Sequence, residues 1–527
     1  MKPAQENRMP PGIPFIVANE FAERFCYYGI NAILTIYMTQ FLHFGDAKAT
    51  TWQSLFKSGA FLFPLLGAIV SDVLWGKYRT IMVFSLVYAA GCTVLTFVSG
   101  QTGLVAGLFL IAFGTGGIKP CVSTNVGDQF TGKSAHLIER AFSYFYLAIN
   151  AGSSISIFFC PLLLATRGPK AAFGVPAIMM LLATLVFWLG RRRFAVVPPA
   201  GKAWLRDVLS PAGLKTIGGL AVIYLFIAVF WSLWDQSNGQ TWTLQAQSDL
   251  MDKNLAFGWT ILPAQIQVVN GLFILAMVPI FTFGIYPLLG RLFTLTPLRK
   301  IGIGLFVVAA SFLLVAWIEG RIQSGHSVSV WWQILAYAIL TASEVLVSIT
   351  ALEFSYKQAP LRVKSFIMAL YLLSTSAGNL LTAEVNSAMV RPLAVANIET
   401  GAQTWVKLDN VARFVTGQKI DFDGDNGVQV VTSQGTQPLS GIFLVATIDV
   451  PTRRIQLMDV IKRMPVTSTG VFKPAQSEVS TYALVGPYYF LFFAAAAGGV
   501  ACMFIFVAVA YKEKIYLRES TLADATP

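Results

Sequence analysis

The sequence predicts an all-α membrane protein with twelve transmembrane helices in two six-helix bundles, plus a small β-rich insert before the last helix. Of its 527 residues, 55% are hydrophobic and only 12% are charged, whereas a soluble protein of this size is about one-quarter charged. The mean hydropathy is +0.63. Apolar runs of about 20 residues, the length that crosses a bilayer as a helix, recur along the chain. One long polar stretch near the C-terminus interrupts this pattern.

Twelve apolar runs have the length and hydrophobicity of spanning helices. Because twelve crossings return the chain to its starting side, both termini are expected on the same side of the membrane. Loops on that side hold most of the Lys and Arg residues, which places both termini in the cytoplasm of a multi-pass protein of the cell membrane. The predicted spans are residues 14–41, 51–74, 79–99, 103–123, 142–165, 172–191, 213–237, 265–289, 300–318, 331–354, 364–390 and 482–511.

The net charge of +12 comes from short basic clusters between the apolar runs. Membrane proteins distribute their charge in this way, so we expect a lipid bilayer as a partner and no nucleic acid. The five cysteines lie in or beside apolar runs, and none has a C-x-x-C spacing. We therefore expect no metal site, no disulfide framework and no cofactor.

The longest connection on the cytoplasmic side, "RRRFAVVPPAGKAWLRD", follows the sixth span and divides the chain into two halves. Transporters of the major facilitator type are built in this way, with substrate sites near the membrane midplane between the halves. The expected segments are an N-terminal bundle at 1–192, a linker at 193–212, helices 7–11 at 213–390, an extracytoplasmic insert at 391–480, helix 12 at 481–511 and a cytoplasmic tail at 512–527.

The stretch "GAIVSDVLWGKYRT" (residues 67–80) connects the second and third spans. It resembles the loop motif of major facilitator transporters, with Gly67, Asp72, Gly76 and Arg79 in the expected order. The resemblance implies that Asp72 and Arg79 take part in gating. A tight turn with a surface ion pair is the alternative interpretation.

Residues 391–480 lack a long apolar run and instead show short stretches that alternate between apolar and polar residues, such as "TWVKL" and "VQVVT". Alternation at a period of two, between Gly, Pro, Asn and Asp turns, predicts β-strands. Within this insert, "DFDGDNG" (421–427) is similar to a calcium-binding loop, but Gly427 comes one position late and Thr432 stands where a Glu is required. An exposed turn is therefore the favoured interpretation, and the partner of the insert is unknown.

The first span contains the unusual stretch "NEFAERFCYYG" (residues 19–29). Arg24 lies ten residues after Pro14, which is about 15 Å along a helix and near the centre of the hydrocarbon core. Glu20, Glu23 and Arg24 have the spacing of one helix face, and charges at that depth usually mark an ion or substrate path. Neighbouring carboxylates increase each other's proton affinity and a guanidinium decreases it, so the cluster is suited to exchange a proton. A purely structural ion pair is the alternative.

Five stretches together identify the chain as similar to the proton-dependent oligopeptide transporter family, also called the peptide transporter family. The first is the "ExxERFxYYG" pattern of helix 1. Because these motifs extend over helices 1–12, the resemblance implies a major facilitator fold and a symporter that imports di- and tripeptides with protons. The other four stretches are "GTGGIKP" (114–120), "FYLAINAGS" (145–153), "FWSLWDQSNGQTWTLQA" (230–246) and "SEVLVSITALEFSYKQAP" (343–360).

The chain departs from the family pattern at two places. Phe61 occupies a position three residues before Pro64 where the family usually has Tyr, so one hydroxyl contact to substrate is expected to be absent. Animal members carry an extracellular domain between helices 9 and 10, whereas this insert lies between helices 11 and 12, so the role of that domain is not transferable. The helix pair that many bacterial members insert between the sixth and seventh spans is missing as well.

A small peptide has a cationic amine at one end and a carboxylate at the other, so its pocket needs two oppositely charged poles. The resemblance places a positive pole at Arg24 and Lys119 and a negative pole at Glu344, and the planar guanidinium of Arg24 suits a carboxylate. An inward proton gradient would act through the helix 1 cluster. The implied residues are Glu20, Glu23 and Arg24 for proton coupling; Arg24 and Lys119 for the carboxylate; Glu344, Asn150 and Asn270 for the amine; Tyr27, Tyr28, Phe61, Trp231 and Trp234 for side-chain pockets; and Asp72, Arg79, Asp235 and Gln236 for gating.

Several of these residues also have structural interpretations. Glu344 is compatible with a helix cap, the two asparagines with contacts between helices, and the aromatic residues with packing. Asp235 suits either a gate or a proton site, and Lys57 is compatible with a side chain that snorkels to water.

Two other function classes are compatible with part of the sequence. One is a related transporter of another anion, such as nitrate, although such proteins generally lack the full acidic motif that Glu20 and Glu23 complete here. The other is a membrane receptor or anchor that acts through the outer β-rich insert. An enzyme is disfavoured, because no nucleophile–base pair, metal cluster or phosphate loop is visible in the sequence.

Overall fold

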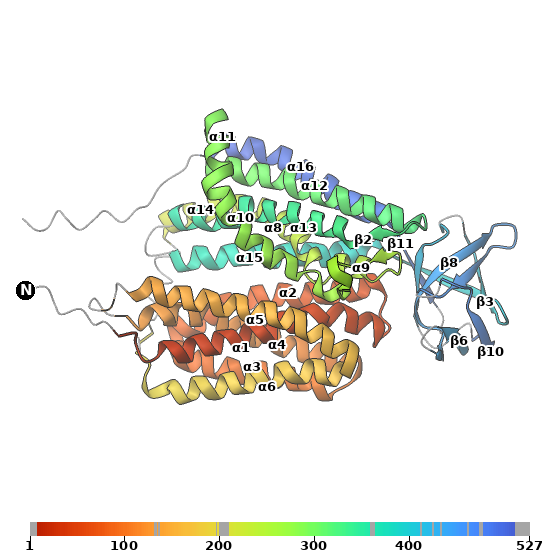
Figure 1. Ribbon diagram of the computed structural model, residues 1–527, viewed down its shortest axis with the longest axis horizontal. Coiled ribbons are helices and arrows are strands. Elements are labelled where there is room, and N and C mark those ends of the chain that lie inside the picture. The colour runs from red at the N-terminus through yellow and green to blue at the C-terminus, as the bar shows by residue number, and fades with distance from the viewer. Residues whose placement is uncertain are drawn as a thin grey trace, which may run out of the picture.

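The computed structural model describes residues 8–130, 134, 137–195, 198–199, 210–358, 364–411, 414–423, 426–432, 435–460, 463–473 and 478–511. Two groups of long helices lie side by side, and a group of β-strands projects from one end of them (Figure 1). Helix α1 begins, and helix α16 ends, at the end away from the strands (Figure 1). Most of the predicted linker, 200–209 included, and the predicted tail at 512–527 lie outside the described residues.

The first group of helices, here called the N-terminal bundle, packs around its own hydrophobic core, with buried residues such as Ile30, Ile111 and Phe173. Glycines let its helices approach closely, since a Cβ added at Gly67 would lie 2.5 Å from the backbone oxygen of Gly116. The bundle consists of α1 (Ile13–Gln40), α2 (Asp46–Ile69) with the π turn η1 (Val70–Trp75), α3 (Lys77–Phe97), α4 (Gly100–Asp128), α5 (Ile138–Arg167) and α6 (Pro169–Leu189).

The second group, here called the C-terminal bundle, has a separate core that includes Ile227, Phe312 and Phe504. Two of its long segments are interrupted by π turns: η6 (Phe281–Ile285) and η7 (Val345–Ile349). The other elements are α8 (Pro211–Ser237), α9 (Thr241–Ala246), α10 (Val268–Ile280), α11 (Tyr286–Leu292), α12 (Pro297–Gln323), α13 (Val330–Glu344), α14 (Thr350–Gln358), α15 (Lys364–Met389) and α16 (Pro487–Ala510).

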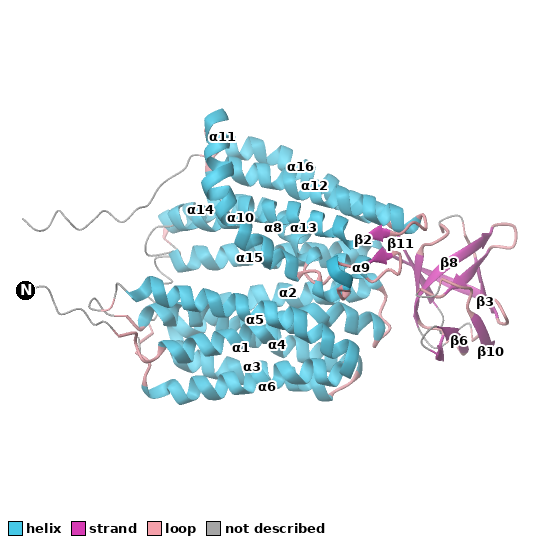
Figure 2. Ribbon diagram, in the orientation of Figure 1, coloured by secondary structure: helices cyan, strands magenta, loops and turns pink. Residues whose placement is uncertain are grey.

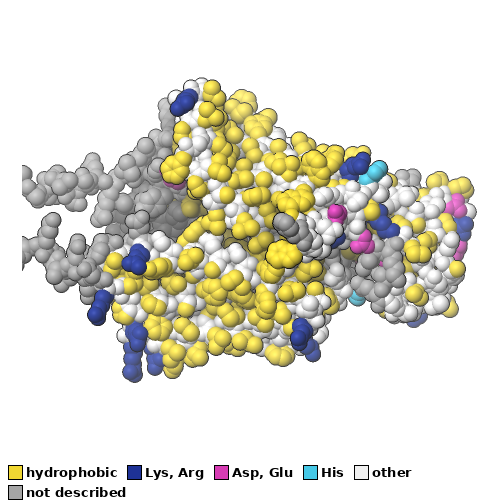
Figure 3. Space-filling view, viewed as in Figure 1, with side chains coloured by type: hydrophobic (Ala, Val, Ile, Leu, Met, Phe, Trp, Pro, Cys, Tyr) yellow, Lys and Arg dark blue, Asp and Glu magenta, His cyan; other side chains and the backbone are white. Residues whose placement is uncertain are grey.

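The helices have the length and surface of membrane spans. Among the described residues, 10 helical segments are long and apolar enough to cross a bilayer. Apolar side chains such as Phe283 and Phe506 are 82% and 76% exposed on the outside of the bundles. Figure 3 shows hydrophobic side chains along the flank of the helices, with Lys and Arg toward the helix ends. The chain is therefore a mostly helical, multi-pass membrane protein, as predicted.

The number of spans stays a prediction, because α1 and α15 are absent from those 10 segments although they have 28 and 26 residues. Three charged side chains interrupt the apolar run of α1, and α15 carries buried polar residues such as Asn379 and Asn386. Both features suit helices that face the interior of the protein more than lipid.

The strands between α15 and α16 form a closed barrel with the order β11–β3–β4–β9–β8–β5, and a three-stranded sheet, β10–β6–β7, lies beside it (Figure 2). A core that includes Val406, Phe422 and Leu457 fills the barrel. The strands are β3 (Val390–Glu399), β4 (Trp405–Leu408), β5 (Lys419–Asp423), β6 (Val428–Thr432), β7 (Gly435–Pro438), β8 (Gly441–Asp449), β9 (Arg454–Met458), β10 (Thr467–Gly470) and β11 (Glu478–Tyr482); β1 (Met251–Asp252) and β2 (Val328–Ser329) pair elsewhere.

The structure corrects two of the predicted span boundaries. The span predicted at 265–289 extends over Pro263–Leu292 in the structure, and the π turn η6 lies within it between α10 and α11. The span predicted to begin at 482 begins at Pro487, because Tyr482 belongs to β11 and pairs with Val390 of β3. Apolar composition identifies both segments but does not show where the backbone changes its hydrogen bonding.

Candidate functional site

The three charges of the first span lie together in the structure. The Arg24 Nε atom is 2.6 Å from Glu20 Oε1 and 3.2 Å from Glu23 Oε2. Glu20 and Glu23 are 1% and 0% exposed, and the Thr115 hydroxyl of α4 donates a hydrogen bond of 2.5 Å to Glu23 Oε1. The spacing of these residues on α1 puts them on one face, and α4 provides the polar partner that the sequence did not indicate.

Lys119 of α4 is held between two aromatic rings. Its Nζ atom lies 4.1 Å from the centre of the Tyr27 ring and 4.2 Å from that of Phe61. Tyr27 in turn packs edge-on against Tyr28 at 5.4 Å between ring centres. Among the described residues Lys119 has no carboxylate within ion-pair distance, so these rings stabilise its charge in place of an anion.

The predicted negative pole lies on the C-terminal bundle. Glu344 Oε2 accepts hydrogen bonds from Trp234 Nε1 at 2.8 Å and from Asn270 Nδ2 at 2.9 Å. Trp234 also packs edge-on against Trp231, with ring centres 5.4 Å apart. Glu344 is the last residue of α13 and directly precedes the π turn η7, a type of irregularity that is frequent at functional sites.

The two predicted poles lie on different bundles. Arg24 belongs to α1 and Lys119 to α4 of the N-terminal bundle, whereas Glu344 ends α13 of the C-terminal bundle. Asn150 does not join this group through any described contact, because its amide donates to the backbone oxygen of Tyr146, one turn back in α5, at 2.8 Å. Asn150 thus has a contact within its own helix, and the roles of the predicted pocket residues stay predictions.

A buried ion pair joins the bundles near the end that carries the strands. Lys57 Nζ of α2 lies 3.4 Å from Asp235 Oδ1 of α8 and donates to the backbone oxygen of Asn238 at 2.7 Å. Lys57 and Asp235 are 1% and 2% exposed. Asn379 of α15 donates to the other Asp235 oxygen. The interpretation of Lys57 as a side chain that snorkels to water is therefore wrong.

More hydrogen bonds between the bundles gather at the same end. Thr35 donates to the backbone oxygen of Gly239 at 2.6 Å, the Ser58 and Ser376 hydroxyls lie 2.9 Å apart, and Asn386 donates to Thr50 at 3.0 Å. In the described part of the chain, no hydrogen bond joins the bundles at the opposite end. The two bundles are therefore closed against each other at the strand end. The predicted charged poles lie between this closure and the opposite end of the bundles.

Besides Asp235, the residues predicted to take part in gating are Gln236, Arg79 and Asp72. Gln236 donates to the backbone oxygen of Ser232 and accepts from Thr241, both in the C-terminal bundle. Arg79 lies in the first turn of α3, after Gly76, whose φ of 75° suits glycine at this turn. Asp72 lies in η1, and its side chain is outside the described residues. The predicted role of Asp72 and Arg79 in gating thus stays a prediction.

The comparisons with known proteins agree with these features. A sequence profile of the POT family matches residues 78–210 and 203–406. The chain belongs to the POT family. Its members are transporters, not enzymes.

Curated relatives of this POT family protein include peptide transporters of animals. Peptide transporter family 1 of Drosophila melanogaster is 39% identical over 361 residues, which are 60% of this chain and 48% of that protein. Solute carrier family 15 member 2 of Homo sapiens is 36% identical over 367 residues, or 60% of this chain and 49% of that protein. The chain thus spans about half the length of the curated relatives that it matches.

Solved structures of POT family transporters share the fold. The POT family transporter PepTSo is 33% identical, with a TM-score of 0.67 over 72% of this chain and 90% of that one. A structure described as an auto inhibited POT family peptide transporter is 27% identical, with a TM-score of 0.71 over 97% of this chain and 99% of that one. The second match includes nearly the whole chain.

Proposed function

We propose that this POT family protein is a proton-coupled symporter that imports di- and tripeptides by alternating access between its two bundles. The observation that carries the proposal is the placement of opposite charges on facing bundles, with Arg24 and Lys119 on one and Glu344 on the other. Relatives named as peptide transporters support the same substrate class. Because the poles belong to different bundles, a bound peptide favours the state in which the bundles close around it.

The positive pole suits the carboxylate of a peptide. Arg24 offers a planar guanidinium, which binds carboxylates with two parallel hydrogen bonds, and Lys119 adds a second positive charge. In the structure Arg24 is held by Glu20 and Glu23, and Lys119 by two rings. A substrate carboxylate therefore competes with these carboxylates for Arg24 but meets no carboxylate competitor at Lys119 among the described residues.

The negative pole suits the amine of a peptide. Glu344 Oε2 is occupied by Trp234 and Asn270, and Oε1 takes part in no described hydrogen bond, so Oε1 is the atom that we assign to the substrate ammonium. The hydrogen bonds from Trp234 and Asn270 fix the direction of the carboxylate. Asn270 thus acts by positioning Glu344, and Trp231 and Trp234 form a wall of the side-chain pocket.

Proton coupling is assigned to Glu20, Glu23 and Arg24. When both acids are ionised they hold Arg24; when one takes up a proton, Arg24 is freer to bind the substrate carboxylate. Release of that proton to the cytoplasm then returns Arg24 to the acids and weakens its hold on the peptide. The coupling ion is the proton, and we assign no cofactor.

We further propose that the strand end faces outward and that the protein lies in the plasma membrane with both termini in the cytoplasm. The distribution of Lys and Arg supports this orientation. Exposed Trp259, Trp331 and Trp332 lie near the strand end, as expected where helices leave the hydrocarbon core. Twelve spans, a bundle boundary at residues 193–212 and a β-rich insert between helices 11 and 12 complete the proposed organisation.

Uptake by proteoliposomes tests the proposed function. An extended peptide lengthens by about 3.3–3.6 Å with each residue, and a pocket between fixed poles tolerates one such step better than two. We expect strong competition with labelled dialanine from dialanine and trialanine, and weak competition from tetraalanine and free alanine. Accumulation should require an inward proton gradient. Nitrate uptake, or no uptake of any peptide, would contradict the proposal and favour another transporter or a receptor.

Replacing Lys57 by Met should weaken the outer closure. Removing one partner of a buried ion pair typically costs about 3–5 kcal/mol, because the remaining charge is left without compensation. We expect dialanine uptake to fall at least about tenfold, and the Lys57→Met/Asp235→Asn variant to recover much of the loss because no unpaired charge remains. Size-exclusion profiles of both proteins report folding. Equal loss in the single and double variants would show that charge compensation is not the function of Lys57.

A further inference from the structure

The barrel is firmly attached to the C-terminal bundle. Helix α15 ends at Met389 and β3 begins at the next residue, while β11 leads into α16 after a short connection. These two entry strands pair with each other, and the backbone nitrogen of Ala483 donates to the oxygen of Met389 at 2.8 Å. Buried Gln418, just before β5, donates to Thr481 of β11 at 2.5 Å. Strand β5 is therefore linked, through the entry strands β3 and β11, to helices α15 and α16 of the C-terminal bundle.

The same strand touches the N-terminal bundle. Lys419 Nζ of β5 lies 2.7 Å from Asp46 Oδ2, in the first turn of α2. The two side chains are 35% and 21% exposed. Burial acts to lower the pKa of Lys419, but the charge of Asp46 and its hydrogen bond outweigh burial, so the pKa is raised and Lys419 stays charged.

The loop that precedes Asp46 fits closely against the barrel. A Cβ added at Gly45 would lie only 1.9 Å from Asp421 Oδ2 and 3.1 Å from Asp421 Cβ. Gly45 has φ −61° and ψ 154°, which any residue adopts, so the need for glycine comes from the neighbouring strand and not from the turn. Next to it, a Cβ at Gly441 of β8 would lie 3.2 Å from His43 Cβ.

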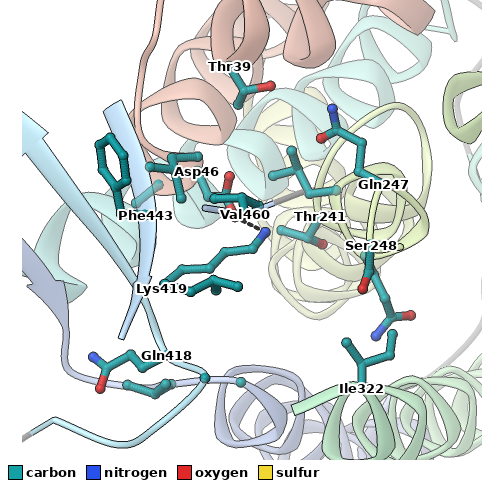
Figure 4. A pocket seen from close by; sticks show the side chains of 18 of the residues that line it. Thr39, Asp46, Thr241, Gln247, Ser248, Ile322, Gln418, Lys419, Phe443 and Val460 are labelled. Atoms are coloured by element: carbon teal, nitrogen blue, oxygen red, sulfur yellow. Dashed lines mark hydrogen bonds and ion pairs between the residues drawn. The ribbon is translucent and has the colours of Figure 1, made fainter. Parts of the chain in front are cut away.

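These contacts form one edge of a cavity of about 450 Å³ at the junction of the barrel and both bundles. Figure 4 shows Lys419 and Asp46 joined by their ion pair at this cavity, with Thr241 and Ser248 of the C-terminal bundle nearby. The cavity lies outside the closure made by Lys57 and Asp235, and the predicted substrate poles do not line it. At this edge, the described contacts that join the barrel to the N-terminal bundle are those of Lys419 with Asp46, Asp421 with Gly45 and Gly441 with His43.

We propose that the barrel is a working part of the outer gate, a clamp on α2 in which Lys419 binds Asp46 and Asp421 packs against Gly45. The inference rests on the proposed function, since alternating access requires the bundles to separate at the strand end. The barrel stays with the C-terminal bundle through β3 and β11. When α2 moves away, these contacts break, and while they last they hold the outer side closed.

A reversible cross-link tests the clamp. Gly45 and Asp421 have nearly the Cβ separation of a disulfide, about 3.5–4.5 Å, so the Gly45→Cys/Asp421→Cys protein should cross-link on mild oxidation. Exposed Cys502 is replaced by Ser, and the other four cysteines are buried. We expect the oxidised protein in proteoliposomes to lose nearly all dialanine uptake and to recover it on reduction. The two proteins that carry only one of the introduced cysteines, Gly45→Cys or Asp421→Cys, should not respond to oxidation.

A second readout does not depend on transport. Ser376→Cys reports outer opening, because Ser376 is 5% exposed within the closure, where its hydroxyl contacts Ser58, and should react with an impermeant maleimide only when the gate opens. All rates are compared with that of the Ser376→Cys protein alone. Lys419→Gln should raise this labelling rate at least about threefold, the shift expected from losing a partly buried ion pair. Exposed Lys407 on β4 is the matched control, and Lys407→Gln should leave the rate unchanged.

The outcomes separate the two proposals. Complete cross-linking without a change in either uptake or Ser376→Cys labelling would overturn the clamp and leave peptide transport standing. If the protein without introduced cysteines takes up no dialanine, the proposed function fails, and the labelling of Ser376→Cys still decides whether the barrel holds the outer side closed.

Discussion

Proteoliposomes that contain the Glu23→Gln protein are expected to exchange dialanine between equal pools but not to concentrate it under an inward proton gradient. Glu23 is completely buried, and its Oε1 atom accepts from Thr115 at 2.5 Å. Its Oε2 atom has no hydrogen bond in the described part of the chain and lies 3.2 Å from Arg24 Nε. That oxygen is therefore the one that we assign to proton uptake.

The substitution preserves shape and removes the proton site. Gln keeps a carbonyl oxygen for Thr115, but its amide does not take up a proton at physiological pH. Arg24 then keeps Glu20 as its acidic neighbour at 2.6 Å, and binding of a peptide carboxylate no longer depends on protonation of Glu23. Accumulation should fall to the level seen without a gradient, whereas exchange, which needs only peptide binding and bundle movement, should persist.

The matched control for this experiment is Glu384→Gln, which removes an exposed carboxylate of α15 and should leave accumulation intact. Labelled dialanine is measured inside the liposomes with and without the gradient, and exchange is measured with equal peptide on both sides. A Glu23→Gln protein that still concentrates dialanine would show that Glu23 is not the coupling group. Loss of both accumulation and exchange would assign Glu23 to folding or peptide binding instead.

The Glu344→Gln protein is expected to bind free dipeptides about 10- to 100-fold more weakly, the effect of losing one hydrogen bond between charged groups. The neutral side chain keeps an oxygen for Trp234 and Asn270, so the local packing remains. Only the negative charge that faces the substrate ammonium is lost. Acetyl-dialanine has no ammonium, and its weaker binding should hardly change.

Competition against labelled dialanine by dialanine and acetyl-dialanine, on both proteins, measures this difference. The acetylated peptide is the internal control, since it reports any general damage to the pocket. Equal loss of affinity for the free and the blocked peptide would show that Glu344 does not bind the amine. Tighter binding of the free dipeptide by the Glu344→Gln protein would reverse the proposed orientation of the substrate, because Glu344 would then face the carboxylate.

Local sequence patterns were sufficient for the membrane class, for most of the helices and for the face of α1 that carries Glu20, Glu23 and Arg24. These features depend on composition and on the 3.6-residue repeat of a helix, which act within one segment of the chain. The alternating residues of the insert likewise predicted strands such as β4 and β6. The breaks at η6 and η7 were not predictable, because apolar composition favours a straight helix equally well.

Contacts between distant segments required the tertiary structure. Lys57 and Asp235 lie 178 residues apart in the sequence, Trp234 and Glu344 lie 110 apart, and Asp46 and Lys419 lie 373 apart. A charged residue within an apolar run indicates that a partner or water is needed, because burial of an unpaired charge is costly. It does not indicate which helix provides the partner, since that depends on how the two bundles pack. For the same reason, the sequence by itself determined where the polar groups stand along each helix, and only the tertiary structure decided that Lys57 joins the two bundles near the strand end and that Lys419 joins the barrel to α2.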